Sequence, residues 1–168
     1  YVDHYVVYRD GSVLGTSTTT SYPDVAVVPL TPYSYEVSAV NRDGYEGMRS
    51  AAAIVTVPGI TNYAIPDASH IEIFFTEALT PATATVLDNY VFAGGVLSNA
   101  TLSANGLKVT LRTTEPLVIG NSYSVTIQNL ATVSGNELRD GLGIAFPYAP
   151  QGDGYILREY WTGIGGTL

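Results

Sequence analysis

The clearest shortages in this 168-residue chain are those of cysteine and of positive charge. The lack of cysteine excludes a disulfide framework and a thiolate metal site. Lysine and arginine together number 7 against 15 acidic residues, which gives a formal net charge of −8. Without a basic patch, the chain cannot neutralise phosphates or an anionic bilayer surface. The composition therefore argues against nucleic acid as a partner and against attraction to membranes.

Long apolar runs are also missing. No run approaches the ~18 residues of a membrane span, so this segment is not expected to insert into a bilayer. No leader peptide is visible, and Tyr1 is predicted to lie within a strand, which favours a fragment of a longer protein. Since 46% of the residues are hydrophobic and only 13% are charged, the chain has ample material for packed cores.

What is abundant is typical of β-structure. Thr, Ser, Gly, Tyr and Val dominate, and residues 29–41 show a bend followed by strict alternation. In that stretch Tyr35, Val37 and Ala39 share one face, as period two requires of a half-buried strand. We predict that the hydroxyl of Tyr35 ties the incoming loop to the backbone, as a structural tyrosine does in an immunoglobulin-like sandwich.

Turn signals divide the first third of the chain into strands. Asp10-Gly11 predicts a hairpin with a return strand over 12–16. A short apolar strand is predicted over Val25–Val28, and another strand over Ser50–Val57. Pro58-Gly59 then indicates a boundary between two domains.

A second series of strands is predicted from Ile60 onwards. Alternating runs include 71–75, 107–112 and 123–128, and Thr80-Pro81 predicts the cap and first position of one helical turn. Pro116-Leu117 precedes Tyr123 much as Pro29-Leu30 precedes Tyr35, so Tyr123 is predicted to be a second structural tyrosine. The fold class is therefore all-β, with tandem immunoglobulin-like β-sandwiches.

Two stretches resemble known modules. Residues 1–57 resemble the later part of a fibronectin type III domain, through 5–11 and 30–41. That resemblance implies that the module's first two strands precede Tyr1, so the first sandwich is incomplete. Residues 59–148 resemble the bacterial Ig-like repeat of surface-layer and secreted proteins. The segments that carry this second resemblance are 73–85, 89–90, 101–111, 120–127 and 135–138.

The end of the chain resembles a third kind of module. After a linker over 149–154, residues 155–168 resemble the opening strand of a PA14 domain, a β-barrel that often binds carbohydrate. The resemblance rests on 157–164. It implies that Tyr160 and Trp161 are candidate ligand contacts, since exposed aromatic rings can stack on sugars.

The sequence contains few residues that could form a catalytic or metal-binding site. The two histidines, His4 and His70, are expected to be ordinary strand residues. Asp67-Ala68-Ser69-His70 contains the residue types of a catalytic triad, but side chains so close in sequence on a turn and strand point apart. Sandwich strands offer no sugar cleft between paired acids, so catalysis by carboxylates is not expected. The acids considered for that role are Glu72, Glu77 and Glu115. No catalytic residue, cofactor-binding residue or metal ligand is assigned.

Calcium is the one cofactor left open. Asp88-Asn89 and Asn136-Glu137 with Asp140 supply oxygen ligands, although turn chemistry explains the same residues. Gly163 to Gly166 precedes no predicted helix and is not a phosphate loop.

These inferences lead to three hypotheses for function. The first is a non-catalytic spacer or adhesion segment of a large bacterial multidomain protein, extracellular or at the cell surface. The second is a carbohydrate-binding protein that acts through the PA14-like domain. The third is a set of accessory modules of an exported glycoside hydrolase. The partners expected are extracellular polysaccharide or other surface proteins.

Overall fold

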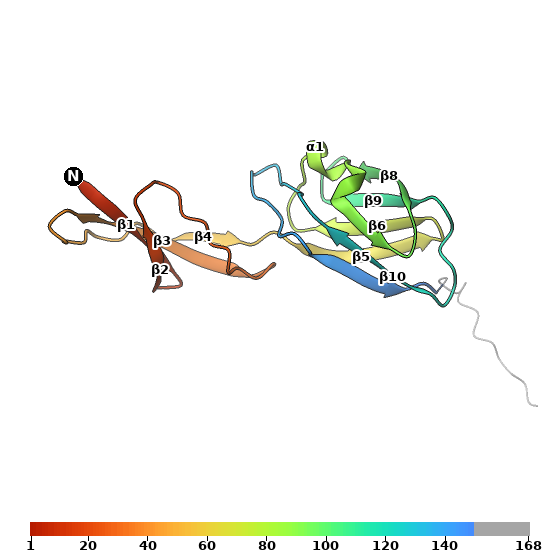
Figure 1. The fold of residues 1–168 in the computed structure, drawn as a ribbon, viewed down its shortest axis with the longest axis horizontal. Coiled ribbons are helices and arrows are strands. Elements are labelled where there is room, and N and C mark those ends of the chain that lie inside the picture. Colours follow the sequence, from red (N-terminus) through yellow and green to blue (C-terminus); the bar gives the residue numbers. More distant parts are fainter. Residues whose placement is uncertain (150–168) are drawn as a thin grey trace, which may run out of the picture.

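The computed structural model describes residues 1–149, and two strand-rich bodies follow one another along its longest axis (Figure 1). The predicted domain from residue 155, with Tyr160 and Trp161, lies outside the described residues, as does the predicted linker from residue 150 onwards. The elements in chain order are β1 (Val2–Arg9), β2 (Ser12–Ser17), β3 (Pro32–Asn41), β4 (Ala53–Thr56), β5 (Ile60–Asp67), β6 (His70–Phe75), α1 (Pro81–Ala84), the 3-10 turn η1 (Leu87–Asn89), β7 (Tyr90–Ala93), β8 (Leu97–Leu102), β9 (Lys108–Thr113), β10 (Ser122–Ile127) and β11 (Gly143–Pro147).

The first body is a single antiparallel sheet with the strand order β2-β1-β3-β4. The hairpin predicted at Asp10-Gly11 is confirmed, and both residues have positive φ, 52° and 79°. Within residues 1–149 this sheet has no second sheet packed on it.

The strand predicted over Val25–Val28 is wrong, because residues 18–31 form a loop between β2 and β3 in which 25–28 pair with no strand. Side chains take the backbone groups that a strand would use. The Ala26 N–H is bonded to Asp24 Oδ1 at 3.1 Å, and the Val28 N–H is bonded to the Tyr33 hydroxyl at 3.1 Å. Val25 is left 86% exposed.

The second body is a two-layered β-sandwich, which confirms the predicted all-β, immunoglobulin-like architecture. One sheet has the order β5-β6-β9-β8 and the other β11-β10-β7. Burial alternates along the central strands, so each sheet turns one row of side chains toward the other. The fully buried residues of the central strands are Ile71, Ile73, Val109, Leu111, Val125 and Ile127.

The helical turn predicted at Thr80-Pro81 is present as α1, with Thr80 at the N-cap position. The Thr80 side chain does not cap the helix. Its hydroxyl instead lies 2.9 Å from the Thr83 hydroxyl and donates to the Ala131 carbonyl at 3.3 Å. The helical turn is therefore held by a contact to the loop after β10. None of the helices within residues 1–149 has the length and apolar character needed to cross a membrane.

Candidate binding groove on the first sheet

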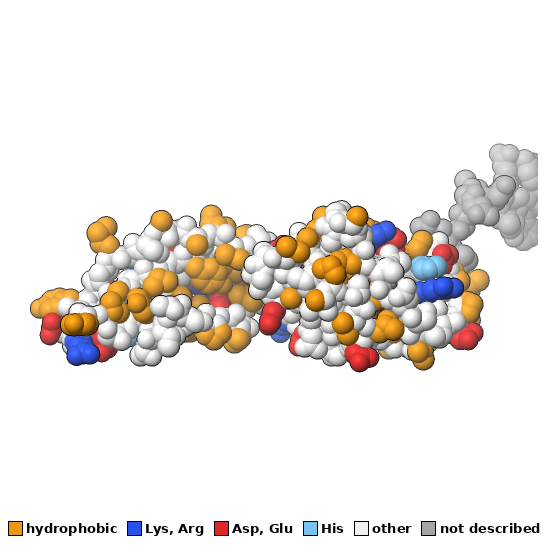
Figure 2. Space-filling model, turned by 90° about the horizontal axis from the view of Figure 1, so that it is seen from above, with side chains coloured by type: hydrophobic (Ala, Val, Ile, Leu, Met, Phe, Trp, Pro, Cys, Tyr) orange, Lys and Arg blue, Asp and Glu red, His pale blue; other side chains and the backbone are white. Residues whose placement is uncertain are grey.

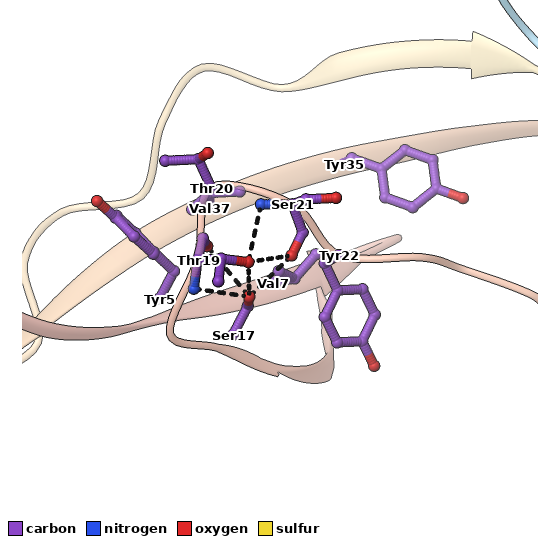
Figure 3. A pocket seen from close by; sticks show the side chains of 9 residues that line it. All are labelled: Tyr5, Val7, Ser17, Thr19, Thr20, Ser21, Tyr22, Tyr35 and Val37. Atoms are coloured by element: carbon purple, nitrogen blue, oxygen red, sulfur yellow. Dashed lines mark hydrogen bonds between the residues drawn. The ribbon is translucent and has the colours of Figure 1, made fainter.

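The open face of the first sheet carries a groove of about 410 Å³. Its floor comes from Tyr5 and Val7 of β1 and from Tyr35 and Val37 of β3 (Figure 3). Val7 and Val37 are direct partners across the two strands, so the floor is continuous. On the face shown in Figure 2, hydrophobic side chains gather over this body.

Hydroxyl groups of the loop over 17–22 form one wall of the groove. The Ser17 hydroxyl donates to the carbonyls of Thr19 and Ser21 at 3.1 and 2.8 Å, and it accepts from the Thr19 N–H at 3.1 Å (Figure 3). These bonds shape the loop locally. They also leave its aromatic residue, Tyr22, facing the sheet.

Tyr22 lies directly over Gly15 of β2. A Cβ atom at position 15 would be 2.2 Å from the Tyr22 hydroxyl, so glycine is needed for the ring to lie there. The hydroxyl donates to the Leu14 carbonyl at 3.3 Å. Tyr22 therefore closes one end of the groove by packing on the backbone of β2.

Asp24 anchors the far end of the same loop to the sheet. Its carboxylate accepts from the Arg9 guanidinium at 2.8 and 3.1 Å and from the Tyr35 hydroxyl at 2.9 Å. Burial opposes ionisation of Asp24, but bonds from Tyr35, the Ala26 N–H and Arg9 outweigh it and lower its pKa. Burial and the bond to Asp24 raise the pKa of Tyr35 to about 12.

Charged residues of the loop after β3 cover the centre of the opposite face of the sheet. Glu46 accepts hydrogen bonds from the Ser38 hydroxyl, at 2.5 Å, and from the Tyr8 hydroxyl. These two bonds lower the pKa of Glu46. The Arg49 guanidinium lies 3.5 Å from the centre of the Tyr8 ring, a cation–π contact. The centre of this opposite face, around Tyr8 and Ser38, is therefore covered by Glu46 and Arg49.

The structural tyrosines differ in part from the sequence prediction. In the first sheet it is Tyr33, not Tyr35, whose hydroxyl bonds a backbone N–H, that of Val28, five residues earlier. Tyr35 bonds Asp24 instead. In the second body the Tyr123 hydroxyl accepts from the Val118 N–H at 2.8 Å, again five residues earlier. The Tyr123 ring stacks against Phe92 and Phe146, with centroids 5.7 and 5.9 Å away.

The histidines and acids weighed as catalytic candidates do not converge. His4 pairs with Asp3 at 3.0 Å and His70 with Asp67 at 2.8 Å, both at the surface. Because the two pairs lie on different bodies and face solvent, neither forms a triad.

Two of the three acids considered for catalysis, Glu72 and Glu77, bond neighbouring side chains. Glu72 pairs with Lys108 at 2.6 Å, and Glu77 accepts from Ser134 at 2.6 Å. Asp140 accepts from the Asn129 N–H at 2.7 Å, as an ordinary turn residue does. Within residues 1–149, no three His, Asp or Glu side chains come together as metal ligands.

Sequence reasoning missed Tyr22, which closes one end of the groove, and the pair of Arg9 and Asp24, which holds the loop to the sheet. The partners of Asp24 lie 15 and 11 residues away along the chain. The groove combines aromatic rings, hydroxyls and aliphatic side chains. That lining can stack on and hydrogen-bond a ligand, and it holds no base positioned beside a nucleophile.

Comparison with known proteins agrees with the two-layered fold. Residues 50–147 match the family model described as the bacterial Ig-like domain. Since this match covers more than half of the chain, the chain belongs to that family.

Two curated relatives match over part of their length. One is a poly(3-hydroxybutyrate) depolymerase of Ralstonia pickettii, 44% identical over 52 residues, which are 31% of this chain and 11% of the relative. The other is an alpha-amylase of Niallia circulans, 30% identical over 99 residues, which are 59% of this chain and 7% of the relative. The chain thus spans about a tenth or less of the relatives it matches.

A solved structure shares the fold. The S-layer protein rSbsC(31-844) has a TM-score of 0.50 and 23% sequence identity to this chain. The alignment covers 55% of this chain and 14% of that protein. At this identity the likeness shows the architecture alone.

Proposed function

We propose that this chain is a non-catalytic connecting segment of a large bacterial protein that is secreted or attached to the cell surface. It would hold a binding or catalytic module at a set distance from its attachment. The observation that carries the proposal is the arrangement of the two bodies in line, joined by only three residues between β4 and β5. Membership of the bacterial Ig-like family and the length of the matched relatives support it.

The proposed division of the chain follows the sequence. The first domain spans 1–57 and the second 59–148, with the boundary at Pro58-Gly59. The two separate hydrophobic clusters support this division, because one contains Val6, Tyr8 and Val40, and the other draws only on residues after Gly59. The net charge of −8 favours solubility and suits neutral or cationic extracellular partners, such as polysaccharide or other surface proteins.

Deletion of residues 59–147 from the parent protein tests the spacer proposal. We expect binding by the distal module to stay intact while its reach from the attachment point shortens. Replacing the deleted residues with an unrelated Ig-like sandwich of equal length should restore the reach. Binding of the isolated 168-residue chain on a glycan array would contradict a pure spacer.

A second candidate function is favoured by the matches to a depolymerase and an alpha-amylase. In this alternative the two domains are accessory modules of an exported hydrolase and bring it to an insoluble polymer. Sedimentation of the chain with poly(3-hydroxybutyrate) granules and with granular starch distinguishes the two candidates. Retention on either polymer supports the accessory role, and its absence from both leaves the spacer proposal as the better account.

A third candidate places carbohydrate binding in the PA14-like domain, through Tyr160 and Trp161. These residues lie outside the described part of the chain, so this candidate depends on the sequence resemblance alone. Alanine substitution of both residues in the longer parent protein, followed by the same glycan array, tests it. Unchanged binding would count against their role.

A further inference from the structure

The junction between the two bodies is bonded on both sides. Its three residues are Val57, Pro58 and Gly59, and the last two are buried. Toward the first body, the Val57 carbonyl accepts from the Leu30 N–H at 2.9 Å, and the Val57 N–H donates to the Thr31 carbonyl at 3.1 Å. The last residues before Gly59 therefore continue the hydrogen bonding of the first body.

Gly59 is bonded to the second body through Thr76. The Gly59 N–H donates to the Thr76 hydroxyl at 3.0 Å, and the Gly59 carbonyl accepts from the Thr76 N–H at 3.1 Å. Proline has no N–H, so every N–H group of the junction has a partner. A flexible linker has a solvated backbone instead.

Gly59 is also enclosed sterically by the first body. A Cβ atom at this position would be 2.8 Å from Leu30 Cδ2 and 3.0 Å from Pro29 Cβ. Leu30 has a φ of 64°, in the left-handed region that a leucine adopts only at a cost. This strained conformation places the Leu30 side chain against the junction, where it fills the space above Gly59.

Apolar surface flanks a cleft of about 480 Å³ beside the junction. Val25, Val27 and Val57 line it from the first body, and Leu130 and Leu138 line it from the second. Asp24, Glu137, Arg139 and Asp140 also line the cleft, so closing it by bending at the junction would take charged groups out of water, which is unfavourable.

We propose that Gly59, held between Leu30 and Thr76, is a fixed joint that sets the angle between the two bodies. The joint is a property of the fold and goes beyond the spacer proposal, since a spacer can also be flexible. Its two parts are the pair of bonds to Thr76 and the close contact with Leu30. Loss of either part should free the angle.

Distance measurements by pulsed electron spin resonance on the full chain test the joint. The chain has no native cysteine, so Val13→Cys in β2 and Val91→Cys in β7 give two unique label sites, 64% and 54% exposed. The chain that carries these two labels and no further substitution, called the background below, should give one narrow distance distribution. Gly59→Ala should shift its maximum, because the new methyl group would also lie 3.0 Å from Cβ of the rigid Pro29 ring, which cannot turn aside as Leu30 can. Thr76→Val should broaden it, because the isosteric side chain no longer bonds the Gly59 N–H.

Gly47→Ala is the matched control. A Cβ atom there meets only the Ala39 carbonyl at 3.5 Å, an ordinary contact, so the distribution should not change. Circular dichroism of each variant checks that both bodies stay folded. A broad distance distribution in the background would overturn the proposal, and this result does not depend on whether the other variants fold. Identical distributions in the background, Gly59→Ala and Thr76→Val would overturn it as well.

Discussion

The two bodies are built from the same alternating strands but are stabilised by different means. The second buries a continuous cluster of eighteen side chains between two sheets, whereas the first has a buried cluster of only Val6, Tyr8 and Val40. The first sheet relies instead on the Arg9–Asp24–Tyr35 contacts at one face and on Glu46 and Arg49 at the other. Similar strand patterns can therefore give one body with a large apolar core and another whose faces are covered by polar contacts from its loops.

This difference predicts unequal stability. Burial of apolar surface between layers is the main favourable term in folding, and a single sheet has little of it. We expect calorimetry to resolve two transitions, with the first body unfolding at the lower temperature. A single transition that all probes share would contradict independent stabilisation of the two bodies.

The largest effect is expected from truncation of the sandwich core. Leu111 is fully buried, so Leu111→Ala should lower the free energy of unfolding of the second body by about 2–5 kcal/mol. Val37, 39% exposed in the groove, is its counterpart in the first body, and Val37→Ala should cost less than about 1 kcal/mol. Denaturant titration followed by circular dichroism measures both. Equal costs would mean that the open face is covered in solution.

The two backbone-bonded tyrosines give a closer comparison, because both bond an N–H five residues earlier. Tyr123→Phe leaves the partly buried Val118 N–H without its partner and should cost about 1 kcal/mol. Tyr33→Phe should cost less, because the Val28 N–H is exposed and water can replace the hydroxyl. The same titrations measure this pair, and a larger cost for Tyr33→Phe would show that the loop over 18–31 is better packed than its exposure indicates.

The dependence of stability on pH tests the contacts of Asp24 and Tyr35 in the first body. The pKa of Asp24 is lowered in the folded state, so its contribution is present above the ordinary pKa of 3.8 and is lost as the pH falls below it. The pKa of Tyr35 is raised from 10.0 to about 12, so its contribution is present below pH 10 and is lost between pH 10 and about 12. The melting temperature of the first transition should therefore fall as the pH drops below 3.8 and as it rises from 10 to about 12.

Asp24→Asn is the control for this pH dependence. It keeps the shape of the side chain but removes the charge that Arg9 and Tyr35 bond, so the acid dependence assigned to Asp24 should disappear. The pKa of Tyr35, followed by NMR of labelled tyrosine rings, should fall toward 10.0 in this variant. A Tyr35 pKa that stays near 12 would assign the shift to burial alone, which is the largest of its causes.

The smallest effect is expected at the edge of the first sheet. Ile54 in β4 is 76% exposed, so Ile54→Thr should change stability by no more than about 0.5 kcal/mol. Ile73→Thr in the sandwich core places a hydroxyl where Ile73 is fully buried and should be far more damaging. Thermal denaturation of the two variants side by side gives the comparison.

The local parts of the fold were predictable from sequence. Alternation identified the strands, and Asp10-Gly11 and Thr80-Pro81 identified a hairpin and a helical turn, because these signals depend on neighbouring residues. The loop over 18–31 was not predictable in this way. Its four-residue apolar run favours a strand, but Arg9 and Tyr35, distant in sequence, hold Asp24 and turn the chain away from pairing.

The groove was predictable only in its floor. Tyr35 and Val37 were placed on one face by period two, whereas the walls depend on side chains that meet across the loop. Tyr33 and Tyr35 share that face, and sequence alone did not show which hydroxyl reaches the backbone. In the structure, the hydroxyl of Tyr33 accepts from the N–H of Val28, five residues earlier. The same interval separates Tyr123 from Val118, whose N–H bonds the Tyr123 hydroxyl.

The direction of β4 has a consequence for a chain under tension. β1 and β4 both pair antiparallel with β3, so they run the same way, and β4 ends at the joint. A pull between the start of β1 and the end of β4 acts along the strands and across their hydrogen bonds. The bonds of each ladder then share the load instead of opening one at a time. This geometry suits a segment stretched between a fixed surface and a tethered load.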